Sequence, residues 1–272
     1  MNDARFGDLE VLVQSPSATA SKKRRHETPL LFVHGAYAAA WCWQEHFLPY
    51  FAEQGFTGYA VSLSGHGKSR GRRELDSFGI KDYVDDVAEV VAKLGQPPVL
   101  IGHSMGGFVV QKYLEKREAP AAVLMSAVPP QGLMSAAFGL MFQKPGLMRD
   151  LNDLMGGNKV SVDTLREALF AQPVDVEDLA RFFKYSQRES HHAIWDMTLF
   201  NLPHPSRLKR APLLVLGGQH DQLIPASLVE MTARTYAVEA EIFPGLGHGL
   251  MLERDWRLVA SHIKDWLVAQ DL

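Results

Sequence analysis

Short apolar runs that end at glycine or at a polar turn recur along the chain. Runs of roughly four to eight such residues are typical of strands buried on both faces of a sheet. One of them also alternates apolar and polar residues, as a half-buried strand does. The predicted strands lie at residues 9–14, 29–35, 58–67, 97–104, 121–127, 211–218 and 240–245.

Two longer segments repeat apolar residues every three or four positions, which is the period of an amphipathic helix. Residues 80–95 place Tyr83 and Val87 on such a stripe and end at Gly95, a common helix stop. Residues 255–270 predict a closing helix of the same kind. Because buried strands separated by helices are typical of parallel sheets, we predict an α/β fold, a mostly parallel central sheet with helices on both faces.

The alternation stops between residues 129 and 207, where several short helices are predicted. We therefore expect a core made of residues 1–128 and 208–272, with 129–207 as a helical cap over one edge of the sheet. Met and Phe side chains in this segment suit an adaptable apolar wall, which favours substrates with an apolar acyl or alcohol group. The candidate pocket residues from the cap are Phe138, Met141, Phe142 and Trp195.

Composition narrows the possible functions only modestly. The chain has 272 residues, 46% hydrophobic and 22% charged, with a formal net charge of -3. This balance gives no sign of a nucleic-acid partner, and no apolar run is long enough for a membrane span. Cys42 is the single cysteine, which favours a reducing, cytoplasmic setting and excludes thiolate metal clusters. We expect no metal or organic cofactor, and the sequence predicts no particular oligomeric state.

The stretch GHSMGG, residues 102–107, follows a predicted strand and precedes a helical pattern. A serine at a sharp strand-to-helix turn projects its hydroxyl from the edge of the sheet, and small neighbours let the backbone bend tightly. The helix that follows directs its first N–H groups toward charge that develops near the serine. This context favours Ser104 as a nucleophile over an incidental serine in a glycine turn.

A serine nucleophile needs a base, and the base needs an acidic partner. His248 lies among three glycines after the last predicted strand, and Asp221 follows the strand before it. The order Ser104, Asp221, His248 is the one expected when the nucleophile lies mid-sheet and its partners follow later strands. Two other histidines have weaker positions: we expect His103 to point away from the reacting face and His66 to brace loops.

With these residues placed, the chain resembles the α/β-hydrolase fold superfamily, over nearly its whole length outside 129–207. The resemblance rests on LLFVHGA, GHGKS, GHSMGG, GGQHDQLIP and GLGHGLML in that order. HGAYAAAWCW with GHSMGG looks closest to the serine carboxylesterase and plant methylesterase branch, which also holds hydroxynitrile lyases. A helical cap between the sixth and seventh strands is also a common feature of this superfamily.

The resemblance implies an oxyanion hole formed by the backbone N–H groups of Ala36 and Met105. Tyr37, beside Ala36, either adds a hydroxyl to the pocket or walls it, and we favour the wall. Serine rather than aspartate at position 104 argues against dehalogenase and epoxide hydrolase chemistry. We place no lysine that would match the one needed by the related hydroxynitrile lyases.

These observations predict a serine hydrolase that cleaves a small-molecule carboxylic ester through Ser104, His248 and Asp221. The same residues would also serve carbon–carbon bond hydrolysis, acyl transfer or perhydrolysis. A third hypothesis is a receptor of the same fold with slow turnover. We expect Trp41 and Trp43 to pack their helix against the sheet and the pocket wall, and Cys42 to be a buried, inert thiol.

Overall fold

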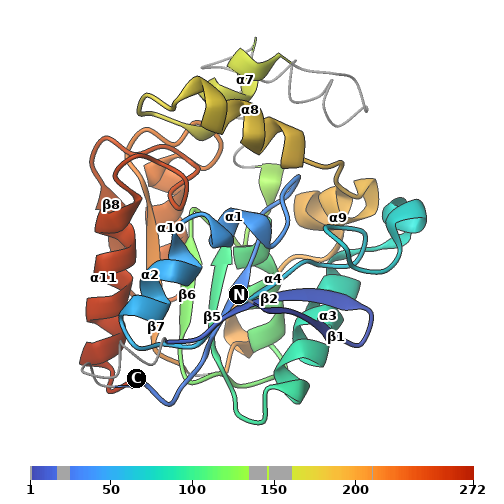
Figure 1. Ribbon diagram of the computed structural model, residues 1–272, viewed down its shortest axis with the longest axis vertical. Helices are drawn as coiled ribbons and strands as arrows, with labels where there is room; N and C mark the ends of the chain where they lie inside the picture. The colour runs from blue at the N-terminus through green and yellow to red at the C-terminus, as the bar shows by residue number, and fades with distance from the viewer. Residues whose placement is uncertain (1, 17–24, 135–145, 147–160, 210) are drawn as a thin grey trace.

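An eight-stranded sheet crosses the molecule in the order β1-β2-β4-β3-β5-β6-β7-β8 (Figure 1). β1 and β2 run antiparallel to their neighbours, whereas β3 through β8 pair in parallel. The strands are β1 (Asn2–Phe6), β2 (Leu9–Gln14), β3 (Leu30–Val33), β4 (Gly58–Val61), β5 (Val99–His103), β6 (Ala122–Met125), β7 (Leu213–Gly218) and β8 (Ala240–Phe243). All seven predicted strands are present. The eighth, β1, was not predicted, because its sequence NDARF contains no apolar run.

The computed structural model describes most of the chain, namely residues 2–16, 25–134, 146, 161–209 and 211–272. Within these residues, no helix is both long enough and apolar enough to span a lipid bilayer.

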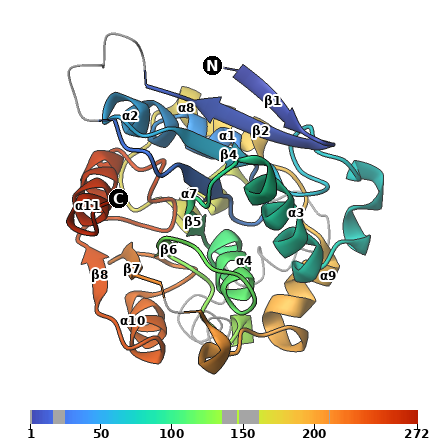
Figure 2. The ribbon, with the colours of Figure 1, turned by 90° about the horizontal axis from the view of Figure 1, so that it is seen from below.

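Helices cover both faces of the sheet, as the sequence pattern predicts (Figure 2). On one face lie α3 (Ile80–Lys93), α4 (Met105–Leu114) and α10 (Ala226–Thr235). On the other lie α1 (Trp41–Gln44), α2 (Phe47–Glu53) and the closing helix α11 (Trp256–Ala269). A 3₁₀ segment, η2 (Arg72–Ser77), precedes α3.

The described part of the connection between β6 and β7 consists mainly of short helices. Figure 1 shows α7 and α8 at the top of the molecule, above α1. The described helices of this connection are α7 (Val162–Leu169), α8 (Val176–Tyr185), α9 (His191–Trp195), the π-helical η3 (Asp196–Phe200) and the 3₁₀ turn η4 (Pro205–Arg207). The break in sequence alternation thus coincides with a real change from strands to helices.

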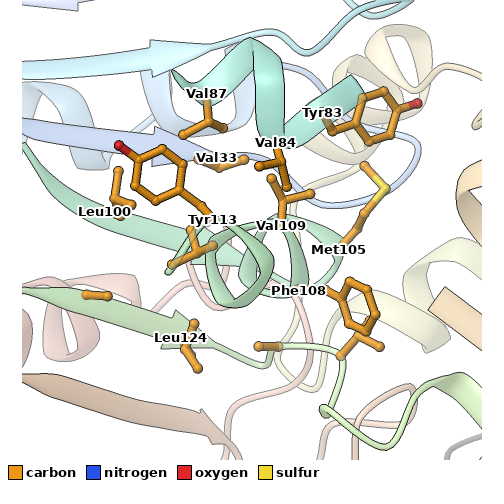
Figure 3. Packing of buried hydrophobic residues seen from close by; sticks show 14 of the residues in the cluster. Val33, Tyr83, Val84, Val87, Leu100, Met105, Phe108, Val109, Tyr113 and Leu124 are labelled. Atoms are coloured by element: carbon orange, nitrogen blue, oxygen red, sulfur yellow. The ribbon is translucent and has the colours of Figure 1, made fainter. Parts of the chain in front are cut away.

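Two apolar clusters fix the helices to the sheet. Figure 3 shows one of them, in which Tyr83 and Val87 of α3 and Phe108 of α4 pack with Val33 and Leu100 of the sheet. On the opposite face, the fully buried ring of Trp43 packs against Phe32 and Phe47, with ring centroids 5.0 and 5.5 Å away. The predicted packing role of Trp43 is confirmed. Burying such aromatic rings removes a large apolar area from water, which stabilises the fold.

The glycines around Ser104 allow the backbone segments of this region to touch. A Cβ atom at Gly102 would overlap the carbonyl of Gly106, and one at Gly106 would overlap the carbonyl of Val33. A Cβ atom at Gly107 would meet the Ala127 side chain. Only glycine therefore lets α4 begin directly above β5 and beside β3, and this close approach places the turn that carries Ser104.

Candidate active site

Three candidate residues lie beyond the carboxyl ends of parallel strands. Ser104 follows β5, Asp221 follows β7 by three residues, and His248 follows β8 by five. Because β5, β6, β7 and β8 pair in parallel, these ends lie along the same edge of the sheet. Ligands of open α/β sheets gather at this edge, so the topology alone brings the three side chains into one region.

Ser104 occupies a strained turn between β5 and α4. Its backbone angles are φ 52 and ψ -116, outside the regions that residues with a side chain ordinarily adopt. Its N–H donates to the Met125 carbonyl at 3.0 Å, and its own carbonyl accepts from Phe108 and Val128, each at 3.2 Å. Strain held in place by surrounding hydrogen bonds is common at functional sites and fits the predicted nucleophile turn.

Asp221 and His248 form a buried pair. The Nδ1–H of His248 donates to Asp221 Oδ2 at 2.8 Å, and the two residues are 3% and 4% exposed respectively. The second carboxylate oxygen of Asp221 accepts the N–H groups of Leu223 at 2.9 Å and Ile224 at 2.8 Å. With the proton on Nδ1, the Nε2 atom of neutral His248 keeps a lone pair, which is the form a general base requires.

His103 lies against His248, although we expected its side chain to point away from the reacting face. Its Nε2–H donates to the His248 carbonyl at 2.9 Å, and the two rings are 4.7 Å apart. Burial, followed by the neighbouring His248, holds the pKa of His103 well below its ordinary value. His103 is therefore a neutral ring that supports the backbone of the histidine loop.

Glu253 is a second support of this loop that the sequence reasoning missed. Its buried Oε1 accepts the N–H groups of Gly247 and Ala171, both at 2.7 Å, and its Oε2 accepts that of Gln172 at 3.2 Å. Burial raises the pKa of Glu253, although these three N–H groups act in the opposite direction. One carboxyl group thus joins the His248 loop to the segment that follows α7. The sequence did not predict this role, because no recognised motif places a glutamate five positions after the histidine.

The loop after β3 lies directly beside the nucleophile turn. β3 pairs with β5 so that Val33 lies opposite Gly102, and Ala36 and Met105 each follow by three residues. A Cβ atom at Gly35 would lie 3.1 Å from the Ser104 Cβ atom, so the two loops are in contact. Met105 is the first residue of α4, where N–H groups have no acceptor within the helix. The fold therefore brings the two predicted oxyanion donors to the same edge as Ser104.

His34 ties this loop to the sheet. Its Nε2 accepts the N–H of Leu63 at 3.1 Å, so its Nδ1 carries the proton and donates to the Gly35 carbonyl at 2.8 Å. Burial, then the nearby His66, lowers the pKa of His34 to about 3. The ring is consequently neutral at ordinary pH and serves as a fixed two-sided hydrogen-bonding group.

Ser104 and His248 line one cavity of about 370 Å³. Residues of the loop after β3 and of the histidine loop line it, together with mostly apolar residues of α1, α7 and α8. The residues of α7, α8 and their connection that line it are Leu165, Ala168, Leu169, Phe170, Phe182 and Phe183. Ser186, Gln187 and Arg188 form a polar margin. A mostly apolar cavity with a few polar groups is typical of a small-molecule site.

Comparison with known proteins agrees with this fold. The family model described as "Alpha/beta hydrolase family" matches residues 30–262, which include Ser104, Asp221 and His248. The chain belongs to the alpha/beta hydrolase family. The resemblance read from the motifs is confirmed, and so is the predicted fold.

Individual relatives of this alpha/beta hydrolase include enzymes that act on esters. It is 25% identical to a monoacylglycerol lipase of Mycolicibacterium smegmatis, over 82% of each chain. It is also 25% identical to a bifunctional esterase/perhydrolase of Acinetobacter calcoaceticus, over 82% of this chain and 86% of the other. The structure of an esterase from Exiguobacterium antarcticum superposes with a TM-score of 0.73 at 19% identity, covering 95% and 94% of the two chains.

The predicted pocket residues of this hydrolase have different outcomes. Tyr37 lines the cavity, and its φ of 63 places it in the left-handed region. Trp195 does not line it: the side chain lies in α9, is 58% exposed and contacts the Phe200 ring. The residues Phe138, Met141 and Phe142 lie outside the described part of the chain. The aromatic side chains that α8 contributes to the cavity are Phe182 and Phe183, which were not predicted as pocket residues.

Trp41 and Cys42 also lie at this cavity. The Trp41 ring stacks on Phe182 with centroids 5.7 Å apart and lies 5.6 Å from the Tyr185 ring, so it forms part of the pocket wall. Cys42 is buried, and burial raises the pKa of its thiol. A thiol held in the protonated form is a poor nucleophile, so the chemistry rests on other residues. In the described ranges, no group of three or more His, Cys, Asp or Glu side chains could hold a metal ion.

Proposed function

We propose that this alpha/beta hydrolase is a serine esterase that cleaves carboxylic esters of small to medium apolar substrates. The observation that carries the proposal is the buried His248–Asp221 pair, whose histidine lines the same apolar cavity as Ser104. Its relatives include a protein described as a monoacylglycerol lipase, which supports ester chemistry.

In the proposed reaction, Ser104 Oγ attacks the ester carbonyl carbon while His248 Nε2 takes the hydroxyl proton. Asp221 stabilises the resulting imidazolium and keeps its ring in the productive orientation. The N–H groups of Ala36 and Met105 receive the negative oxygen of the tetrahedral intermediate, and each such donor contributes about 3 kcal/mol. His248 then protonates the leaving alcohol. Water attacks the acyl-enzyme by the same steps, which releases the acid and restores the serine.

We also propose that residues 129–207 act as a cap that closes the cavity over Ser104. The described part of this segment supplies the apolar wall from α7 and α8. Phe170, Phe182 and Trp41 form a stacked aromatic series, with neighbouring centroids 6.1 and 5.7 Å apart. Aromatic rings in this arrangement favour an apolar acyl or alcohol group of the substrate over a charged one.

Other uses of the same residues can be separated by substrate and by turnover. Perhydrolysis has support from the relative described as a bifunctional esterase/perhydrolase, and it requires hydrogen peroxide to replace water at the acyl-enzyme. Hydroxynitrile cleavage has less support, because none of the described residues that line the cavity is a lysine. A slow receptor would release product once and then stop, whereas an esterase turns over repeatedly.

A series of p-nitrophenyl esters of increasing acyl length tests the proposal. We expect repeated turnover, with kcat/KM highest for short or medium acyl chains and falling for palmitate, because the cavity of about 370 Å³ limits the acyl group. The measurement is the initial rate of nitrophenol release, with and without hydrogen peroxide.

Other results of the same measurements would contradict the proposal. Absence of turnover for every ester, or a single burst with product retained on the protein, would contradict an esterase. A rate that rises steadily to palmitate would contradict the proposed substrate size. Bromination of monochlorodimedone in the presence of acetate, hydrogen peroxide and bromide, at a rate above ester hydrolysis, would favour the perhydrolase.

A further inference from the structure

A second buried cluster of ionisable side chains lies away from the triad. It joins His66, on the loop after β4, to Glu189, on the segment between α8 and α9. His66 Nε2 and Glu189 Oε2 are 3.1 Å apart, and both side chains are fully buried. Tyr83 of α3 donates its hydroxyl to Glu189 Oε1 at 2.7 Å, and Ser190 donates its N–H to the same oxygen at 2.8 Å. Figure 3 shows the Tyr83 hydroxyl pointing out of the apolar cluster.

The charges in this cluster follow from its contacts. His66 Nδ1 faces the Ser64 carbonyl at 3.1 Å, and a carbonyl only accepts, so Nδ1 carries a proton. The other ring nitrogen, Nε2, faces the Glu189 carboxyl group. Burial alone would raise the pKa of Glu189, but His66, the Tyr83 hydroxyl and the Ser190 N–H together lower it. His66 Nε2 and Glu189 Oε2 are thus in close contact at 3.1 Å without forming a hydrogen bond.

Glu189 lies two residues after Gln187, which contacts the loop that contains Ala36. The N–H of Gln187 donates to the Tyr37 carbonyl at 2.9 Å. The side-chain oxygen of Gln187 accepts from the Gly67 N–H at 3.0 Å and from Arg72 Nη1 at 2.9 Å. Residues 186–190 therefore connect the loop after β3 to the loop after β4, and the buried Glu189 fixes the end of this connection.

The loop of Ala36 needs such support because its backbone is strained. Tyr37 has a φ of 63, a conformation that costs a bulky residue free energy unless neighbouring contacts hold it. Within the loop, the Ala38 N–H reaches the Gly35 carbonyl only at 3.4 Å, a long hydrogen bond. The shorter contact from Gln187 comes from outside the loop, so the position of residues 186–190 affects the direction of the Ala36 N–H.

We propose that Glu189, held by His66 and Tyr83, is a positioning residue that sets the oxyanion donor of Ala36 through Gln187 and Tyr37. The inference rests on the proposed esterase function. Glu189 does not touch the reacting atoms; it fixes the segment whose N–H holds the strained loop. Because the oxyanion forms only after attack, misplacing this donor lowers kcat more than it changes KM.

The test compares Glu189→Ala with Glu189→Gln and with a control, Glu115→Ala. We expect Glu189→Ala to lower kcat on a p-nitrophenyl ester by about 10²-fold with little change in KM, the effect of misplacing one oxyanion donor. Glutamine keeps the oxygen that accepts from Tyr83 and Ser190 and has nearly the same shape beside His66, so Glu189→Gln should retain most of the activity. Each variant is assayed well below its own unfolding temperature.

Glu115 is a matched control because it is a buried carboxylate that also ties down the β6–β7 connection. It accepts the His204 N–H at 2.8 Å and pairs with Lys112 at 2.9 Å, away from the cavity residues. Glu115→Ala should lower stability without the selective fall in kcat. Equal falls in kcat for the two alanine variants, or an effect of Glu189→Ala on KM alone, would overturn the proposal.

Amide hydrogen exchange separates this proposal from the proposed function. Peptides that contain residues 34–38 and 186–190 should exchange faster in Glu189→Ala than in the wild type and Glu115→Ala. This readout holds even if the wild type hydrolyses no ester, in which case the esterase proposal alone fails. If Glu189→Ala does not fold, Tyr83→Phe, which removes one hydroxyl from Glu189, should show the same exchange pattern. Unchanged exchange in these peptides would overturn the positioning role.

Discussion

Replacing Ser104 by alanine is expected to lower kcat/KM for p-nitrophenyl esters by at least about 10⁴-fold. The hydroxyl oxygen is the atom that forms the acyl-enzyme. The nearby thiol of Cys42 is a poor substitute, because it is buried and burial raises its pKa. The backbone donors and the cavity remain, so weak substrate binding should persist. The measurement is steady-state hydrolysis with enzyme concentrations high enough to detect the residual rate.

Ser126→Ala is the control for this prediction. Ser126 is buried, follows β6, and also has a positive φ, of 42. Its hydroxyl has no hydrogen-bond partner among the described residues and does not line the cavity. This variant should keep wild-type turnover. Ser104→Ala with wild-type activity, or Ser126→Ala with the larger loss, would contradict the assignment of the nucleophile.

Asp221→Asn is expected to produce the second large effect, a fall in kcat of about 10⁴-fold. The asparagine oxygen can still accept the N–H groups of Leu223 and Ile224, so the turn should keep its shape. The amide nitrogen, however, would donate to His248 Nδ1 and shift the imidazole proton to Nε2. In that tautomer His248 has no lone pair to receive the Ser104 proton.

The measurement is kcat together with the tautomeric state of His248, read by nitrogen NMR. Asp196→Asn is a suitable control, because Asp196 is also buried and accepts a backbone N–H, from Ile80 at 2.9 Å, away from the cavity. It should leave kcat unchanged. A loss of less than about tenfold for Asp221→Asn would mean that His248 does not depend on this carboxylate for its tautomer.

The sequence predicted most of the sheet and the three triad candidates because both depend on local patterns. Apolar runs mark buried strands, and GHSMGG has a spacing that only a tight strand-to-helix turn explains: the clashes at Gly102 and Gly106 show why. Asp221 and His248 were found because each follows a predicted strand. Parallel pairing then brings the strand ends together, which needs no knowledge of side-chain contacts.

The pocket and its supports were not predictable in the same way. Trp195 belongs to an aromatic-rich segment, yet composition does not say which face of a short helix meets a cavity, and its ring is exposed. Glu189 and Glu253 act through contacts with residues 123 and 82 positions distant, His66 and Ala171. The sequence does not distinguish a buried glutamate from a solvent-exposed one, and only the fold shows that Glu189 and Glu253 are buried.

Labelling with a fluorophosphonate probe, followed by mass spectrometry, tests the central claim most directly. The probe phosphonylates a serine that a neighbouring base activates, so it reports the nucleophile without any choice of substrate. We predict one adduct, on the peptide that contains Ser104, and loss of this labelling in His248→Ala. An adduct on another residue, or labelling of Ser104 at the same rate without His248, would contradict the account.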